Sequence, residues 1–226
     1  MDDHITAVSK PSNREKLLSE GLRVVHERGY GASVRDIVQA AGVPQGSFTN
    51  HFVSKEAFGL EVVDLYYAAF NAEVAATLRN DALPPLERLR LWFQDTLDLL
   101  KQDDMRRGCL YGNMSAEASE HSDRIRTRIA GIFRENQESV AYCLRAAVEA
   151  GELRRGIDVP DAAGFIISGF EGAILIAKAQ RSPEPIERFV RVLFSSVLAG
   201  ELKPKGRGPG PAGSSPRSIA KRKKRT

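Results

Sequence analysis

The sequence predicts an all-α protein, and three observations support that prediction. Apolar residues recur three and four positions apart along most of the chain, which is the period of one helix face. A serine followed three positions later by an acidic residue marks two helix starts. The alternating apolar and polar residues that would predict strands are absent from the sequence.

Two such serine–acid pairs open the first two predicted helices. Ser12 and Glu15 have the spacing of a capping box, in which each side chain bonds the other residue's backbone N–H, and Ser33 and Asp36 repeat it. The first helix is expected to end at Gly29, because glycine accommodates the backbone conformation that closes many helices. These signals predict two consecutive helices within the first part of the chain.

The third predicted helix is short and has a polar outer face. It runs from about Pro44 to His51, and Phe48 and Phe52 should anchor it to the first two helices. A tight turn at Gly42 joins it to the second helix, which is the layout of a helix-turn-helix, whose second helix enters the DNA major groove. The alternative is a plain three-helix bundle, but amides and hydroxyls without carboxylates are unusual on a merely solvated face. The residues expected to face DNA are Ser33, Arg35, Gln45, Gly46, Ser47, Thr49, Asn50 and His51.

Beyond residue 60 the pattern remains helical, so a second and larger helical domain is expected. Pro160 suits a helix start, since the first helical turn tolerates a residue without a backbone N–H. The segment DDMRRGCLYGN is expected to be irregular. The predicted helices run from Ser54 to about Arg79, from Pro84 to about Leu100, from about Ser122 to Ala150, from Pro160 over DAAGFIISGFEGAILIAKA, and from about Pro185 to Leu198.

Charge separates the predicted domains from a tail. Residues 203–226 contain nine Lys or Arg and no acidic residue, whereas residues 1–202 hold 24 basic against 29 acidic residues. The run KRKKR, Lys221 to Arg225, is typical of a nucleic-acid-binding arm or a nuclear-import patch, and a solvated tail without a role is the alternative. The expected segments are a flexible N-terminus (1–11), a helix-turn-helix domain (12–58), a larger helical domain (59–200) and a disordered basic tail (201–226).

Several functional classes find no support in the sequence. No apolar run reaches the roughly 18–20 residues of a membrane helix, and the N-terminus lacks the features of a secretory signal, which favours the cytoplasm. The two cysteines, Cys109 and Cys143, have no metal-binding spacing, and the four histidines do not cluster with carboxylates. No nucleophile and base stand paired, so we expect neither an enzyme nor a bound metal or cofactor.

The segment ERGYGASVRDIVQAAGVPQGSFTNHFVSKEAF resembles, in register and without gaps, the DNA-binding domain of the TetR/AcrR family of bacterial repressors. The resemblance implies a homodimer, a double-stranded DNA operator, a small-molecule effector, and an all-helical ligand-binding and dimerisation domain. It also implies that Lys55 contacts a phosphate. Two positions depart from the family's pattern, because Thr49 stands where a tyrosine is usual and Pro44 where serine or threonine is frequent. Operator preference therefore does not carry over.

A shorter segment, GCLYGNMSAE, resembles the family branch that includes regulators of electrophile and acrylate detoxification. It contains Cys109, and Lys101, Arg106 and Arg107 lie close in sequence, where positive charge would lower the thiol pKa and raise its reactivity. Our hypothesis is that Cys109 senses an electrophile or lines a pocket for an acrylate-like or other small carboxylate. The alternative is a buried, inert thiol, which is common for a free cysteine.

An effector pocket needs aromatic walls with a few polar groups, and such residues could converge between the fourth, fifth, seventh and eighth helices. Trp92 and Tyr111 are the stronger candidates, because the polar atom of each needs a partner when buried. For every candidate the alternative is an ordinary place in the hydrophobic core. The candidates are Tyr66, Trp92, Phe93, Thr96, Met105, Cys109, Tyr111, Asn113, Met114, Phe133, Asn136, Gln137 and Phe170.

The last two helices are expected to form the dimer interface, since the resemblance implies a four-helix bundle between subunits. The alternative is that their apolar residues belong to the core of one chain, but they are apolar on more faces than one small bundle buries. Gly164, Gly169 and Gly172 would allow close approach there. The side chains expected to fill the interface are Phe165, Ile166, Phe170, Phe189, Leu193 and Val197.

The leading hypothesis is a ligand-responsive transcriptional repressor that binds a palindromic operator as a dimer and is released by a small molecule. One rival is an activator or a constitutive DNA-binding protein of the same fold. Another is a helical small-molecule-binding protein or enzyme with a vestigial DNA-binding head. The outward-facing side chains expected at Gln45, Ser47, Asn50 and Lys55 argue against that second rival.

Overall fold

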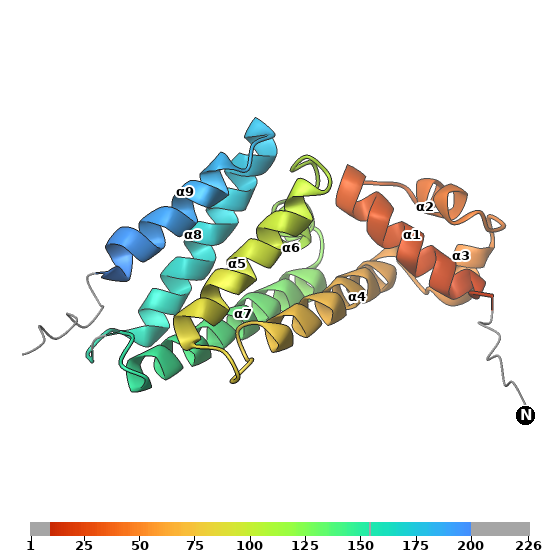
Figure 1. Ribbon diagram of the computed structural model, residues 1–226. Helices are drawn as coiled ribbons and strands as arrows, with labels where there is room; N and C mark the ends of the chain where they lie inside the picture. The colour runs from red at the N-terminus through yellow and green to blue at the C-terminus, as the bar shows by residue number, and fades with distance from the viewer. Residues whose placement is uncertain (1–9, 154, 200–226) are drawn as a thin grey trace, which may run out of the picture.

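The computed structural model describes residues 10–153 and 155–199, and within them every regular element is helical (Figure 1). The all-α prediction is therefore confirmed. Most of the expected flexible N-terminus and all of the expected basic tail lie outside the described residues. A π-helical turn, Leu193–Val197, continues the last α-helix. The α-helices are α1 (Asn13–Arg28), α2 (Val34–Ala41), α3 (Ser47–His51), α4 (Lys55–Ala76), α5 (Pro85–Lys101), α6 (Leu110–Glu117), α7 (Asp123–Glu149), α8 (Val159–Gln180) and α9 (Glu184–Val192).

Helices α1 to α3 form a head at one end of the molecule, and α4 runs from this head into the body (Figure 1). Both expected capping boxes are present, because the Ser12 and Ser33 hydroxyls accept from the backbone N–H groups of Glu15 and Asp36 over 3.2 Å each. Gly42 closes α2 with a φ of 62°, a left-handed conformation that a residue without a Cβ adopts at little cost. The chain can therefore turn sharply towards α3.

Helix α3 is shorter than predicted. It begins at Ser47 and not near Pro44, because the chain there closes a tight turn in which the Ser47 N–H donates to the Pro44 carbonyl over 2.9 Å. Phe48 and Phe52 are both buried, and their ring centroids lie 5.2 and 5.1 Å from that of Phe58 on α4. The predicted aromatic anchor is confirmed, and it extends into α4.

The segment DDMRRGCLYGN, predicted to be irregular, contains the first turn of α6. Before this helix the chain passes through two left-handed residues, Asp104 and Met105, with φ of 56° and 60°. The Asp103 carboxylate holds the turn by accepting from two backbone N–H groups that follow it, over 3.2 Å each. The prediction was wrong because α6 has only eight residues and its N-cap residue, Cys109, makes no side-chain cap, so the sequence carries no start signal there.

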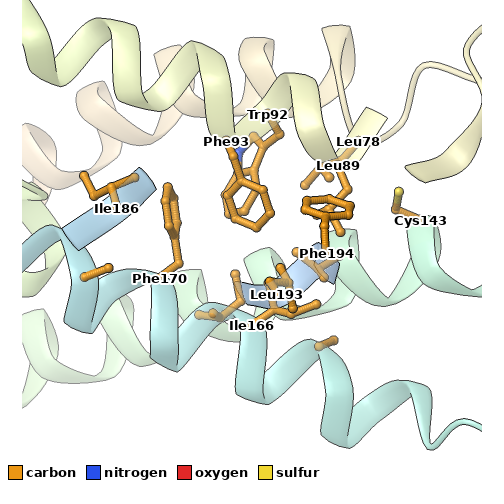
Figure 2. Close-up of a cluster of buried hydrophobic side chains, with 14 of the residues drawn as sticks. Leu78, Leu89, Trp92, Phe93, Cys143, Ile166, Phe170, Ile186, Leu193 and Phe194 are labelled. Carbon is orange, nitrogen blue, oxygen red and sulfur yellow. The ribbon is translucent and has the colours of Figure 1, made fainter. Parts of the chain in front are cut away.

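In the body, α8 lies between α7 and α9, and α5 contacts both α7 and α9 (Figure 1). Trp92 and Phe93 of α5 pack against Phe170 of α8, with ring centroids 5.2 and 4.8 Å apart (Figure 2). Among the described helices, α8 is the one long and apolar enough to cross a membrane. Its contacts with α7 and α9 account for part of that composition, while Phe165, Leu175 and Ile176 remain exposed.

The buried apolar residues form two clusters, which we call the head core and the body core. The body core fills the space between α5, α7, α8 and α9 (Figure 2). The head core joins α1–α4 to α6 and to the first half of α7, through Leu110, Met114 and Ile125 among others. Cys109 and Phe133 lie at the edge of both clusters. The head is therefore built on α6 and α7, while the boundary near residue 58 stays a prediction.

Candidate functional site

The surface predicted to read DNA lies on α3 and the turn before it. The expectation that Ser47 faces outward is wrong, since only 7% of this residue is exposed: the start of α3 packs against α1. The Thr49 hydroxyl donates to the Gly46 carbonyl over 3.1 Å, so its proton is already engaged within the turn. The exposed side chains on this recognition surface are Gln45, Thr49, Asn50 and His51.

Three further residues predicted to contact DNA flank α3. Arg35 is exposed near the start of α2, whereas the Ser33 hydroxyl donates to the Asp36 carboxylate over 2.5 Å. Lys55 donates to the Tyr30 carbonyl over 2.6 Å, and its ammonium lies 4.8 Å from the centroid of the Tyr30 ring. Partial burial lowers the pKa of Lys55. An ammonium has three N–H donors, so this contact leaves two of them for another partner such as a phosphate.

Six residues expected at a dimer interface line one open groove along α8 and α9. Phe165 is 54% exposed there. Ile166 and Phe170 were also expected at the interface, but they lie on the α8 face that packs into the body core. Leu193 borders the groove yet is only 1% exposed, because it too packs into the body core. The six residues are Phe165, Gly169, Gly172, Phe189, Leu193 and Val197.

The glycines of α8 differ in what surrounds them. A Cβ on Gly169 would lie 2.6 Å from Cε2 of Phe189 in the same chain, and one on Gly164 would lie 3.3 Å from Nε2 of Gln137. These two glycines therefore make room for side chains of their own chain, and their part in a dimer interface stays a prediction. Nothing lies within 4 Å of the position that a Cβ would take on Gly172, so this glycine leaves open surface.

A cavity opens between α4, α5, α6, α7 and α8. It encloses about 580 Å³ of space not filled by atoms, its open mouth included. Its walls are mainly aromatic and aliphatic. Seven predicted pocket residues line it, namely Tyr66, Trp92, Thr96, Cys109, Tyr111, Asn136 and Phe170.

Other predicted pocket residues lie elsewhere. Phe93 and Met105 belong to the body core and Met114 to the head core. For these three residues the alternative, a place in the hydrophobic core, is the one observed. Asn113 and Phe133 line a neighbouring, more open pocket that shares Cys109 with the cavity. Gln137 donates to the Pro160 carbonyl over 3.2 Å, outside the cavity.

The sequence did not predict eight cavity residues, seven of which are aliphatic residues, a glycine or glutamates, where aromatic and uncharged polar side chains were expected. Helical spacing could have found several of them. Phe70 and Glu73 follow Tyr66 by four and seven positions, on the same face of α4, and Glu171 directly follows Phe170 on α8. The missed residues are Phe70, Glu73, Leu99, Leu100, Gly108, Ile167, Glu171 and Ile174.

The polar groups of the cavity are poorly satisfied. Nε1 of Trp92 and the hydroxyl of Tyr111 are buried with no hydrogen-bond partner, and within the described part of the chain these are the two buried side-chain atoms in that condition. Burial raises the pKa of Glu171 to about 7 and also raises the pKa of Glu73, although the Thr96 hydroxyl donates to Glu73 over 3.0 Å. Such perturbed, unpaired groups in a cavity are typical of a ligand site.

The hypothesis that basic neighbours activate Cys109 is contradicted. Burial, together with the adjacent Glu171 carboxylate, raises the pKa of the Cys109 thiol well above its ordinary value. The expected cations are engaged elsewhere, since Arg107 pairs with Asp103 over 2.5 Å and Lys101 approaches a glutamate of α9 to 3.3 Å. Cys109 therefore lines the cavity as a protonated thiol.

Two hydrogen bonds connect the cavity wall to the head. Nε2 of His26, on α1, donates to the carbonyl of the cavity residue Gly108 over 2.9 Å. The carboxylate of Glu117, at the end of α6, accepts from the Tyr30 N–H over 2.6 Å, just after α1. A Cβ on Gly29 would collide with that carboxylate, so the glycine that ends α1 also makes room for this contact.

Comparisons with known proteins agree with this architecture. Residues 17–62 match the family described as "Bacterial regulatory proteins, tetR family", and residues 85–193 match "Tetracyclin repressor-like, C-terminal domain". The chain is 38% identical over 186 residues to the HTH-type transcriptional repressor DhaR of Mycobacterium sp. strain GP1, which covers 82% of this chain and 92% of that protein. It is 30% identical over 179 residues to the HTH-type transcriptional repressor NemR of Escherichia coli K12, covering 77% and 88%.

A solved structure extends the comparison to the fold. The crystal structure of the regulatory protein TetR from Rhodobacter sphaeroides superposes with a TM-score of 0.76 at 34% identity, covering 80% of this chain and 96% of that one. Regulators of this kind are generally not enzymes. The head matches one part of the family and the body with its cavity matches the other, so the chain belongs to the TetR family of bacterial transcriptional regulators.

Proposed function

We propose that this protein is a ligand-responsive repressor that acts in the cytoplasm, binds a palindromic DNA operator as a homodimer, and is released by a small molecule. The repressor role is supported by DhaR and NemR, which are both named transcriptional repressors. Three separate surfaces support the three parts of the proposal: the recognition surface on α3, the groove along α8 and α9, and the cavity in the body.

On the recognition surface, Gln45 and Asn50 are the side chains best suited to reading bases. An exposed amide can bond adenine through two atoms at once in the major groove. Arg35, His51 and the remaining donors of Lys55 suit phosphates, which position the head without reading sequence. Two such heads in a two-fold dimer would contact half-sites about 34–36 Å apart, or a multiple of that distance, which requires a palindromic operator.

The second subunit is proposed to cover the groove along α8 and α9. Phe165, Ile176, Val192 and Val197 leave 41–54% of their surface exposed there, in one apolar patch. A contiguous apolar patch of this kind marks a protein interface rather than a solvated surface. Two-fold pairing would let each subunit bury the same patch on its partner.

Helix α6 is proposed to carry the signal from effector to DNA. Its first residues border the cavity, and its last residue, Glu117, holds the chain just after α1. The Gly108 carbonyl, immediately before α6, accepts from His26 on α1. An effector that shifts α6 would therefore move the head, provided that it binds the DNA-free arrangement more tightly than the DNA-bound one.

The observation that carries the effector part of the proposal is the pair of buried, unpartnered donors in the cavity wall. An unsatisfied buried donor costs roughly 1–3 kcal/mol, so a fold keeps one where a ligand completes it. The test begins with the purified protein and a randomised DNA pool, from which bound sequences are recovered. We expect an enriched palindrome, and then a small molecule that dissociates it. Retention of all DNA alike would contradict the repressor proposal.

The basic tail, which lies outside the described residues, is proposed to add phosphate attraction that is independent of sequence. Its nine basic residues offset the charge of residues 1–202, in which acidic residues outnumber basic ones. Deleting residues 203–226 should weaken binding to random DNA more than it lowers operator selectivity, and should flatten the dependence of binding on salt. An unchanged salt slope would show that the tail has no part in DNA binding.

A further inference from the structure

The charges that line the cavity are of one sign. Glu73 of α4 and Glu171 of α8 both reach it, and among the described residues no Lys, Arg or His lines its walls. Neighbouring basic groups are engaged outside it: Lys101 approaches Glu187 to 3.3 Å, Arg107 pairs with Asp103, and Lys178, which lines the adjoining pocket, donates to the Asn113 side chain over 2.8 Å. A negatively charged ligand would enter this cavity without a counter-charge and beside two acidic groups.

The unpartnered groups of the cavity set a second condition. The Trp92 indole N–H can only donate a hydrogen bond, and the Tyr111 hydroxyl is free to donate one as well. A ligand that bonds the Trp92 N–H must therefore carry a hydrogen-bond acceptor. An amine cation would suit the glutamates and the aromatic walls, but it has no acceptor and would leave the Trp92 N–H unpaired.

The rest of the cavity wall is apolar, which sets the character of the rest of the ligand. Phe70, Leu99, Ile167, Phe170 and Ile174 give apolar walls on three helices. A ligand that fills this space must be apolar over most of its surface, with its polar group near Trp92 and Tyr111. A group that can also donate, such as a primary amide, would bond a glutamate in addition.

We propose that the effector is a small uncharged molecule in which a carbonyl-type acceptor adjoins an apolar group, and that carboxylates are excluded from the cavity. This inference rests on the proposed function, because it concerns the same cavity. It departs from the acrylate-like or other small carboxylate expected from the sequence. The sequence showed the cations near Cys109 but not the two glutamates that the fold brings to the cavity.

The experiment uses the full chain at about pH 8, above the pKa of about 7 of Glu171, and probes of one carbon skeleton. Trp92 is the only tryptophan of the protein, so its fluorescence reports directly on the cavity without DNA. Isobutyramide, isobutyrate and isobutylamine are titrated in parallel, and the series is repeated with the cyclohexyl analogues to fill more of the space. We expect the amide to bind at least about tenfold more tightly than either charged probe.

Variants locate the cause of that preference. Tyr111→Phe keeps the ring but removes one donor, so the amide should lose several-fold in affinity. Glu171→Gln removes one acidic group and should reduce the difference in affinity between isobutyramide and isobutyrate. The same change at the exposed Glu149 should leave that difference unchanged. Equal narrowing in both variants would trace the preference to overall charge and would overturn the proposal.

The outcomes separate this inference from the function on which it rests. Tighter binding of isobutyrate or isobutylamine than of the amide would overturn the inference, as would the absence of any fluorescence change with every probe. If an amide binds and the selected operator is not released, the ligand class stands and ligand-responsive release fails. If a carboxylate releases the operator through the cavity, the function stands and the ligand class is wrong.

Discussion

The head core and the cavity differ in how completely their side chains are packed and hydrogen-bonded. In the head, both capping boxes form, and Phe48, Phe52 and Phe58 pack ring against ring. Around the cavity, within the described part of the chain, two buried donors lack partners and no Lys, Arg or His stands in the wall beside the two glutamates. Local rules are kept where the chain has to hold a shape, and they are broken where it has to leave room for something else.

The largest expected effect comes from breaking the head core. Phe58 is 1% exposed and joins α3 to α4, so Phe58→Ala should lower the free energy of unfolding by about 3–5 kcal/mol and abolish operator binding. Chemical denaturation and a DNA-binding titration measure the two effects. Leu65→Ala, on the exposed side of the same helix, is the control and should cost less than about 1 kcal/mol. Equal losses in the two variants would contradict the assignment of this core.

A smaller effect on stability, of opposite sign, is expected from replacing Glu171. Burial raises the pKa of its carboxyl from the ordinary 4.5 to about 7, so the folded protein keeps this proton to higher pH than the unfolded chain does. Stability should therefore fall as the pH rises from about 4.5 to about 7. Tyr66 and Cys109, which face Glu171, also have raised pKa values and stay protonated across this range.

Glu171→Gln removes that pH dependence. Relative to the unaltered protein, the variant should gain on the order of 2 kcal/mol at about pH 8 and almost nothing at about pH 4.5. Urea unfolding at the two pH values gives the comparison, with Glu149→Gln on the exposed surface of α7 as the matched control. A gain that does not change with pH would mean that the carboxyl is not held in its protonated form.

The same contrast explains what the sequence could predict. The head was predictable because capping pairs and glycine turns are local, and they specify α1 and α2 within a few residues. Ser47 was misplaced because its burial depends on how α3 packs against α1, which no local pattern encodes. Helix α6 was missed because it is short and uncapped, and it is held by its neighbours rather than by its own sequence.

The cavity was predictable in part for a related reason. Aromatic residues at helical spacing pointed to the correct helices, and Trp92 and Tyr111 proved to be the unsatisfied groups. The character of the cavity was not predictable, because Glu73 and Glu171 lie on different helices and most glutamates are solvated. The prediction for Cys109 was wrong for the same reason, since the charge that acts on its thiol is Glu171, an acid distant in sequence.

An intermediate effect, on effector-induced release, is expected at the contact between the head and the helix that borders the cavity. Glu117→Ala removes the acceptor for the Tyr30 N–H and should weaken effector-induced release several-fold, equivalent to about 1 kcal/mol of coupling. Affinity for the operator without effector should change little. Glu117→Gln retains a side-chain oxygen and should restore the coupling. If both variants respond to effector like the unaltered protein, α6 does not transmit the signal through this contact.

The smallest effect on stability is expected at Trp92, although its side chain is almost wholly buried. Trp92→Phe gives up part of a packed ring, but it also removes a buried N–H that has no partner. These two terms oppose each other at roughly 1–3 kcal/mol each, so unfolding should shift by less than about 1 kcal/mol, far less than for Phe58→Ala. Calorimetric titration with isobutyramide should nevertheless show weaker binding, because the donor that the variant lacks is the one a ligand would complete. A loss of stability as large as that of Phe58→Ala would show that the Trp92 ring stabilises the body core as much as the Phe58 ring stabilises the head core. The cavity wall would then be ordinary core and not a site left open for a ligand.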